Sequence, residues 1–163
     1  KSAHMKGGSL TVFNDHRILP FGRFLRDTKI NELPQLFNVL LGEMSLIGPR
    51  PLTKKAFDSY SKDVKDIVSS VKPGLSGVGS IIFRNEEKML KDGISQNFFY
   101  NKLMPYKGDL EVWYVNNQSL YLYFKLIFLT IFVVFIPKSK LPNYLLKDAP
   151  EPNKDILSFF RLY

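Results

Sequence analysis

The sequence predicts a single α+β domain that is mainly helical and compact, with a few short strands. Of its 163 residues 45% are apolar, which is enough to bury one core and excludes wholesale disorder. Apolar residues recur at the helical spacing over residues 33–41 and again over 54–70, which predicts two helices that each bury one apolar face. The predicted strands, residues 10–13 and 81–83, are short apolar runs between turn residues.

The first predicted helix has recognisable ends. Thr28 is a suitable N-cap, Pro34 is tolerated only near the first turn, and Gly42 suits the C-terminal exit. Asn31 and Glu32 then lie at the helix N-terminus, where unpaired backbone N–H groups and the helix dipole favour an anion such as phosphate. On the local sequence alone, the alternative is that Asn31 assists the cap and Glu32 only complements the dipole.

A Gly-Pro-Arg-Pro turn follows this helix at residues 48–51. Pro49 and Pro51 fix the backbone on both sides of Arg50, so the guanidinium group is directed at limited entropic cost. Its planar fork can bind two phosphate oxygens at once. A rigid surface turn with a solvated arginine is the alternative, and the preceding helix favours the phosphate site.

The second predicted helix covers residues 54–70 as one continuous element. Gly74, Gly77 and Gly79 are expected to lie in turns, because their spacing fits no nucleotide-binding fingerprint. Further helices are expected over residues 20–26, 86–90 and 96–104.

Residues 120–136 form a nearly continuous apolar segment that contains Lys125. A spanning helix needs about 20 such residues, and a charge at bilayer depth costs roughly 3 kcal/mol. One prediction is therefore a C-terminal amphipathic helix at the membrane interface, with Tyr121, Tyr123 and Phe124 at the headgroups. A buried core helix is the other.

The net charge of +8 and the pI near 9.6 imply an anionic partner. The basic residues are dispersed and form no nucleic-acid-reading motif, so we expect no nucleic acid partner. Anionic membranes and phosphorylated substrates remain as candidate partners. The absence of cysteine excludes disulfides and thiol chemistry, and it suits a cytoplasmic face.

Residues 28–51, TKINELPQLFNVLLGEMSLIGPRP, closely resemble the signature of the bacterial sugar transferases, the monotopic phosphoglycosyl transferases. Residues 14–26 upstream and 71–77 downstream, VKPGLSG, are similar to further segments of that family. The resemblance implies a sugar transferase catalytic domain over residues 1–137 that lacks the family's membrane-anchoring N-terminal helix. Residues 138–163 would form a C-terminal tail that wraps loosely over the surface, docked by Phe159 and Phe160.

The resemblance also implies an activity. The expected enzyme transfers a sugar 1-phosphate from a UDP-sugar to undecaprenyl phosphate with Mg²⁺ and release of UMP, initiating exopolysaccharide or glycoconjugate assembly. Its expected place is the cytoplasmic face of the bacterial inner membrane. By resemblance the catalytic and metal-binding residues are Asn31 and Glu32, and the substrate-binding residues are Lys1, Arg26, Pro49, Arg50, Pro51 and Arg84.

One residue departs from the family motif. The family has Asp-Glu-Leu-Pro where this chain has Asn31-Glu32-Leu33-Pro34, and the missing aspartate is the family's nucleophile, which attacks the β-phosphate to form a covalent phosphosugar. A carboxamide is a poorer nucleophile and a weaker Mg²⁺ ligand. Glu32 could replace it, the transfer could be a single displacement, or the domain could be a catalytically inactive membrane-associated homologue that binds nucleotide-sugar or lipid phosphate.

Overall fold

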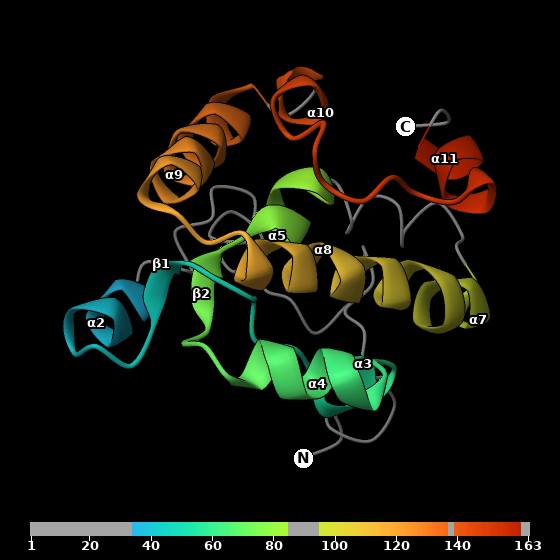
Figure 1. Cartoon of the computed structure of the whole chain (residues 1–163), viewed down its shortest axis with the longest axis horizontal. Helices are drawn as coiled ribbons and strands as arrows, with labels where there is room; N and C mark the ends of the chain where they lie inside the picture. Colours follow the sequence, from blue (N-terminus) through green and yellow to red (C-terminus); the bar gives the residue numbers. More distant parts are fainter. Residues whose placement is uncertain (1–33, 85–94, 137–138, 161–163) are drawn as a thin grey trace, which may run out of the picture.

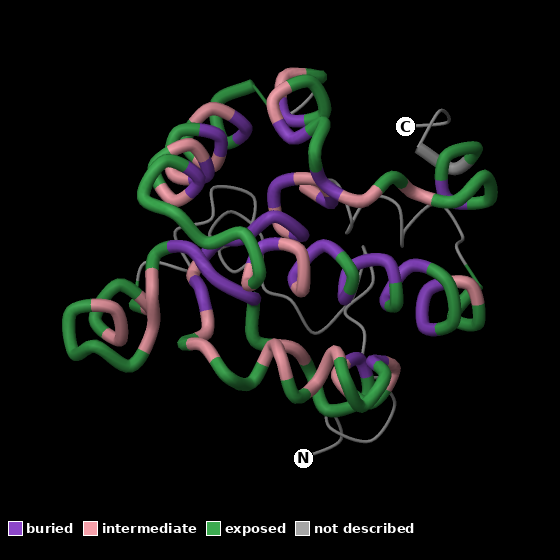
Figure 2. Tube along the Cα trace, in the orientation of Figure 1, coloured by how far each residue is buried: buried purple, intermediate pink, exposed green. Residues whose placement is uncertain are grey.

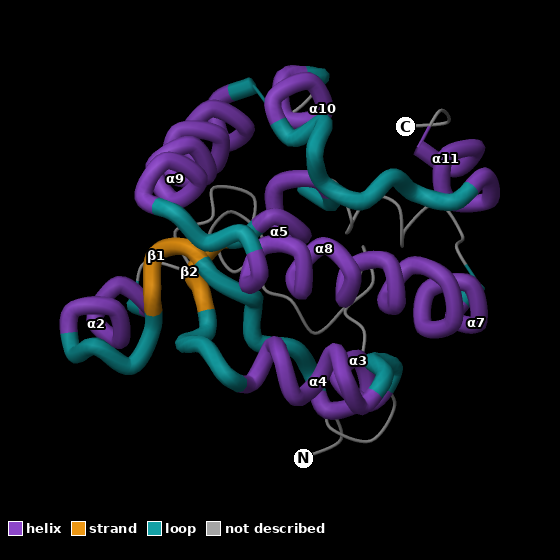
Figure 3. The backbone as a smooth tube through the Cα atoms, in the orientation of Figure 1, coloured by secondary structure: helices purple, strands orange, loops and turns teal. Residues whose placement is uncertain are grey.

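The computed structural model describes residues 34–84, 95–136 and 139–160. These residues form a mainly helical domain with one two-stranded parallel sheet (Figure 3), as the fold-class prediction required. The predicted strand at residues 10–13 and the predicted helices at 20–26 and 86–90 lie outside the described residues. In chain order the elements are α2 Gln35–Leu40, β1 Ser45–Ile47, α3 Lys54–Asp58, α4 Lys62–Ser69, β2 Gly74–Ser76, α5 Val78–Ile82, α7 Gln96–Phe98, the π-helical turn η2 Phe99–Leu103, α8 Met104–Asn116, α9 Leu120–Phe135, α10 Leu141–Leu145 and α11 Lys154–Phe160.

Helix α8 crosses the middle of the molecule, between α4 on one side and α5 on the other (Figure 1). Along much of its length it is buried (Figure 2), and Leu110 is fully enclosed. Gly108 allows α4 to approach closely, since a Cβ there would lie only 3.0 Å from Cγ1 of Val64. The predicted helix at residues 96–104 is confirmed as the continuous run of α7 and η2 into α8.

The sheet pairs β1 with β2 in parallel, with Ser45 opposite Gly74 and Ile47 opposite Ser76. Hydrogen bonds fix it to α9: Ser45 Oγ lies 3.4 Å from the Tyr123 hydroxyl, and Ser76 Oγ lies 2.9 Å from Thr130 Oγ1. The Tyr114 hydroxyl of α8 donates to the Ile47 carbonyl at 3.2 Å. The sheet is therefore tied to both long helices.

The predicted strand at residues 81–83 is wrong. Ile81 and Ile82 belong to α5, and the strand lies earlier, at Gly74–Ser76. A three-residue apolar run has the same pattern in a short buried helix as in a strand. Only the distant partner β1 decides which segment becomes a strand.

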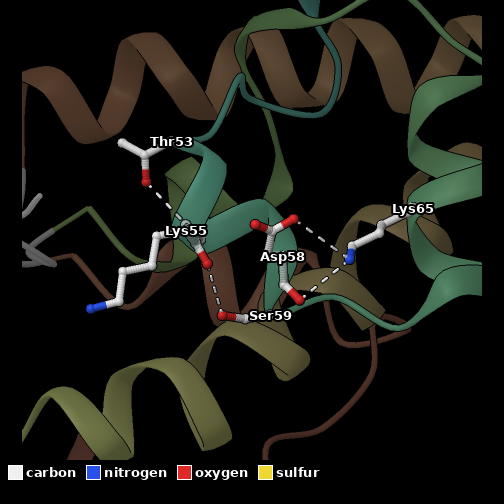
Figure 4. A network of polar contacts seen from close by, with 6 residues as sticks. Thr53, Lys55, Asp58, Ser59 and Lys65 are labelled. Atoms are coloured by element: carbon white, nitrogen blue, oxygen red, sulfur yellow. Dashed lines mark hydrogen bonds and ion pairs between the residues drawn. The ribbon is translucent and has the colours of Figure 1, made fainter.

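The single helix predicted over residues 54–70 is also wrong, because α3 and α4 are separate. Thr53 and Ser61 each cap a helix by accepting a hydrogen bond from a backbone N–H three residues later. Figure 4 shows the corner between the helices, where Lys65 Nζ donates to the Asp58 carbonyl at 3.3 Å and lies 3.9 Å from its carboxylate. Two well-placed caps stabilise two helix starts, and the corner turns Tyr60 into the core.

Helix α9 matches the predicted segment closely. Its core-facing side chains, Leu122, Leu126, Leu129 and Val133, are buried, which confirms that the helix contributes to the core. The opposite side exposes further apolar residues, among them Tyr121, Phe124, Phe128, Ile131 and Phe135. Within the described residues, no helix combines the length and apolarity needed to cross a bilayer.

The prediction of a loose tail is wrong for the described residues 139–160. The tail forms α10 and α11, and it buries Leu146, Ala149 and Ile156. The Tyr106 hydroxyl of α8 donates to the Pro150 carbonyl at 2.9 Å. The tail's apolar residues are separated by prolines and follow no sustained helical period, so the sequence pattern could not predict their burial. The side chains of Phe159 and Phe160 are not described.

We expect Leu126→Ala to lower the free energy of unfolding by about 3 kcal/mol, because it empties a fully enclosed site in the centre of α9. Phe128→Ala is the matched control on the same helix, since that ring is 54% exposed, and it should cost much less. Urea denaturation followed by circular dichroism measures both. Equal losses would contradict the assignment of the buried face.

Candidate functional site

Two sequence motifs that are distant in the chain meet alongside strand β2. Strand β1 runs directly into the Gly-Pro-Arg-Pro turn, and β2 begins with the glycine of the Lys-Pro-Gly motif. The Gly48 N–H donates to the Ser76 carbonyl at 2.9 Å, and the Gly74 N–H donates to the Pro49 carbonyl at 2.9 Å. The two motifs are therefore one hydrogen-bonded unit.

The backbones of this unit touch without intervening side chains. A Cβ on Gly74 would lie 2.2 Å from the Gly48 nitrogen, and a Cβ on Gly77 would lie 2.4 Å from the Gly48 oxygen. Real Cβ atoms essentially never approach other atoms below 3.0 Å. Only glycine fits these positions. The expectation of turns is wrong for Gly74, which lies in β2, and for Gly79, which lies in α5, whereas Gly77 lies in the connection between these two elements.

The turn holds its residues in different environments. Pro49 is buried, whereas Arg50 and Pro51 are exposed. Arg50 therefore lies at the surface, on a backbone that hydrogen bonds to Ser76 and Gly74 hold in place. Arg84 is partly buried and follows α5, and Gly77, just before that helix, lies against Gly48 of the turn. The other predicted site residues, Lys1, Arg26, Asn31 and Glu32, lie outside the described residues.

Helix α2 leads towards this unit and contacts both strands. Its exit confirms the predicted role of Gly42, whose φ of 76° is the left-handed conformation that glycine favours. Pro34 occupies the position before the helix. The prediction that α2 buries an apolar face is wrong, because Phe37 is 69% and Leu40 81% exposed. The apolar period is present, but no neighbouring element covers it in the described structure.

Glu111 lies behind the glycine contact and was not predicted as a site residue. It is only 4% exposed. Its Oε2 lies 3.5 Å from the position that a Cβ on Gly77 would occupy. This Oε2 atom has no hydrogen-bond partner among the described residues. Burial raises the pKa of the Glu111 carboxyl to about 7, while the positive charge of Lys107 and a hydrogen bond from the Gly79 N–H oppose the rise.

The sequence did contain a signal for this residue. Lys107 and Glu111 share the face of α8 that also carries Leu103, Leu110 and Tyr114, at helical spacing. Charged residues on an apolar helix face are buried only with partners. Their position on the apolar stripe marked them as functional or structural candidates.

The described residues contain no group of three or more His, Cys, Asp or Glu side chains that could hold a metal ion. Asn31 and Glu32, the expected metal ligands, are not among them. Their oxygen donors are of the type that Mg²⁺ accepts, because this ion commonly uses one or two carboxylates together with substrate phosphates.

The site is thus an exposed arginine on a proline-flanked turn whose backbone is hydrogen-bonded to β2 and lies against Gly77, with the Glu111 carboxyl buried beside Gly77. The sequence model of the family described as bacterial sugar transferase matches residues 1–137. The chain belongs to this family.

The names of similar proteins agree with this assignment. The chain is 36% identical over 129 residues to a Klebsiella pneumoniae protein named UDP-glucose:undecaprenyl-phosphate glucose-1-phosphate transferase, which covers 77% of this chain and 25% of that protein. It is 39% identical over 121 residues to the undecaprenyl-phosphate galactose phosphotransferase of Salmonella typhimurium, covering 74% and 22%. It is 37% identical over 120 residues to the uncharacterized sugar transferase EpsL of Bacillus subtilis, covering 74% and 52%. The chain therefore spans from about a quarter to about half the length of these relatives.

We expect Gly74→Ala to lower the free energy of unfolding by about 3 kcal/mol, because the added methyl group collides with the Gly48 backbone and neither strand can yield without breaking the sheet. Ser69→Ala, at an exposed position at the end of α4, should change it by less than about 0.5 kcal/mol. Urea denaturation measures both variants. A Gly74→Ala chain as stable as the Ser69→Ala chain would contradict the backbone contact.

Proposed function

We propose that this chain contains the catalytic part of a phosphoglycosyl transferase that moves a sugar 1-phosphate from a UDP-sugar to undecaprenyl phosphate. The observation that supports it most directly is the braced turn that presents Arg50 in a chain of the bacterial sugar transferase family. Relatives of this chain are named for this class of reaction. UMP would be the product that leaves.

Arg50 is proposed to bind the diphosphate of the UDP-sugar. Phosphoryl transfer brings two anions together, so most of the stabilisation comes from fixed positive charge. The guanidinium can grip two phosphate oxygens, and the braced backbone reduces the freedom that binding must remove. Lys1, Arg26 and Arg84 are proposed to share this role, with Pro49 and Pro51 fixing the turn.

Asn31 and Glu32 are proposed to lie at the reacting phosphate and to hold a Mg²⁺ ion together with phosphate oxygens. The bound ion would neutralise charge on the diphosphate. In the proposed reaction a Glu32 oxygen forms a bond to the β-phosphorus, the bond from that phosphorus to the bridging oxygen breaks, and UMP leaves. A phosphate oxygen of undecaprenyl phosphate then attacks the same phosphorus and releases Glu32. A direct attack by the lipid phosphate, with Glu32 as base, is the competing route.

We expect Asn31→Asp to raise the rate of UMP release or to create it, because the substitution restores a carboxylate nucleophile. Glu32→Gln should abolish whatever activity the parent has. The measurement is UMP release by the full-length, membrane-reconstituted protein from a panel of UDP-sugars, with and without undecaprenyl phosphate. Trapping a labelled phosphosugar on the parent distinguishes Glu32 as nucleophile from direct attack.

The panel also tests the alternative. A parent that binds UDP-sugars but releases no UMP under any condition would be an inactive homologue. If Asn31→Asp leaves turnover unchanged and Glu32→Gln is tolerated, the catalytic residues lie elsewhere and this assignment is wrong.

The site is further proposed to work at a membrane surface, on the cytoplasmic face of the bacterial inner membrane. Its acceptor is a lipid, so the site must lie within reach of one leaflet. The support is the exposed apolar side of α9 together with Phe37, Leu40 and Leu41 around α2, on a chain with a net charge of +8. Exposed apolar patches and positive charge both favour an anionic lipid interface.

We expect the double substitution Phe124→Ser and Phe128→Ser to weaken binding of the chain to vesicles of bacterial phospholipids severalfold, because it removes two exposed rings from the outer side of α9. Tyr144→Ser, which removes a still more exposed ring from α10, is the control and should bind like the parent. Co-sedimentation measures both. Equal binding by the double variant and the parent would contradict the role of α9.

A further inference from the structure

A continuous set of contacts leads from Glu111 to Arg50. The Gly79 N–H donates to the Glu111 carboxyl, and Oε2 of this carboxyl lies beside Gly77. Gly77 in turn lies against the Gly48 carbonyl oxygen without a side chain between them. Two residues beyond Gly48, on a backbone fixed by two prolines, stands Arg50. Between the Glu111 oxygen and the turn, this path consists of glycine backbones. A shift of the carboxyl oxygen is therefore not taken up by a flexible side chain along the path.

We propose that Glu111 is a positioning residue for the reaction: acting through Gly77 and Gly48, its carboxyl group sets the position of Arg50 relative to the substrate's phosphates. This inference rests on the proposed function, which identifies the substrate as a nucleotide-sugar. Glu111 itself touches no substrate in this assignment. Its effect is on the backbone that presents the guanidinium.

The two protonation states of Glu111 should act on that backbone in opposite ways. The neutral carboxyl can donate a hydrogen bond towards the Gly48 carbonyl oxygen, whereas the ionised carboxylate repels it. Because burial raises the pKa of Glu111 to about 7, the neutral form dominates below this pH and the charged form above it.

Two other ionisable groups on α8 interact with the Glu111 carboxyl. Lys107, one turn earlier on α8, is the cation that acts on the carboxyl. Burial raises the pKa of the Tyr114 hydroxyl on α8 above its ordinary value of 10.0, with Tyr123 on α9 and Glu111 adding to the rise. The Tyr114 hydroxyl therefore stays protonated around neutrality, while Gly77 and Gly79, before and within α5, face Glu111 with backbone groups only. Among the described groups, we therefore expect a change in the charge of Glu111 near pH 7 to affect the backbone of the turn.

The test compares the full-length, membrane-reconstituted parent with Glu111→Gln. Binding of UDP-glucose and UDP-galactose is measured by calorimetry between pH 6 and 8, without undecaprenyl phosphate. In the parent we expect the dissociation constant to rise severalfold as the pH rises. The glutamine amide is neutral, can accept from Gly79 and can donate towards Gly48. The variant should therefore bind like the parent at pH 6 and show no dependence on pH.

Tyr106→Phe is the matched control, since it removes a hydrogen bond elsewhere on α8, to the Pro150 carbonyl. It should lower the melting temperature while keeping the parent's pH profile. A merely structural role for Glu111 would likewise change the melting temperature but not the profile. A Glu111→Gln protein that keeps the parent's profile overturns the proposal. Should that variant fail to fold, Glu111→Asp must move the midpoint of the profile, and an unmoved midpoint overturns the proposal in the same way.

The readouts separate this inference from the proposed function. If the parent releases UMP but Glu111→Gln does not alter the pH profile of UDP-sugar binding, only the positioning role is rejected. Binding whose pH profile does depend on Glu111, without UMP release under any condition, supports the positioning role and rejects the transferase. Arg50→Lys reports on the phosphate contact itself. It should weaken binding at every pH, because an ammonium group lacks the bidentate fork.

Discussion

The contact on which the site depends is the direct approach of three glycine backbones, Gly48, Gly74 and Gly77. Without side chains between them, the ends of β1 and β2 share hydrogen bonds, and the turn that bears Arg50 rests on the start of α5. A turn with two prolines is stiff by itself, but only these backbone contacts fix its orientation relative to the rest of the domain.

Helices α8 and α9 hold that sheet from different sides and place the site between a buried interior and an exposed surface. Tyr114 ties α8 to β1, while Tyr123 and Thr130 tie α9 to both strands. Each link joins the sheet to a helix whose inner face is core. Helix α9 also exposes apolar residues on its outer side, so these links join the sheet directly to the helix that carries this surface.

Glu111 illustrates why a packed core can retain an ionisable group at a cost in stability. Burying a carboxyl with an unpartnered oxygen is unfavourable, and an apolar residue of similar size would avoid the penalty. The Glu111 carboxyl lies beside Gly77, which in turn lies against the Gly48 carbonyl oxygen of the turn. The apolar helix face marks Glu111 as unusual in the sequence, but only the structure shows what lies beside it.

The sequence by itself determined the family, the helical character, the ends of α9 and the exit of α2 at Gly42, because these depend on residue identity and local spacing. It marked Arg50 through its flanking prolines. It did not determine that residues 74–76 rather than 81–83 form a strand, that residues 54–70 break at a corner, or that residues 146–156 enter the core. Nor did it pair Glu111 with Gly77. Those features depend on contacts between distant segments, which a local pattern does not contain, and so only the tertiary structure decided them.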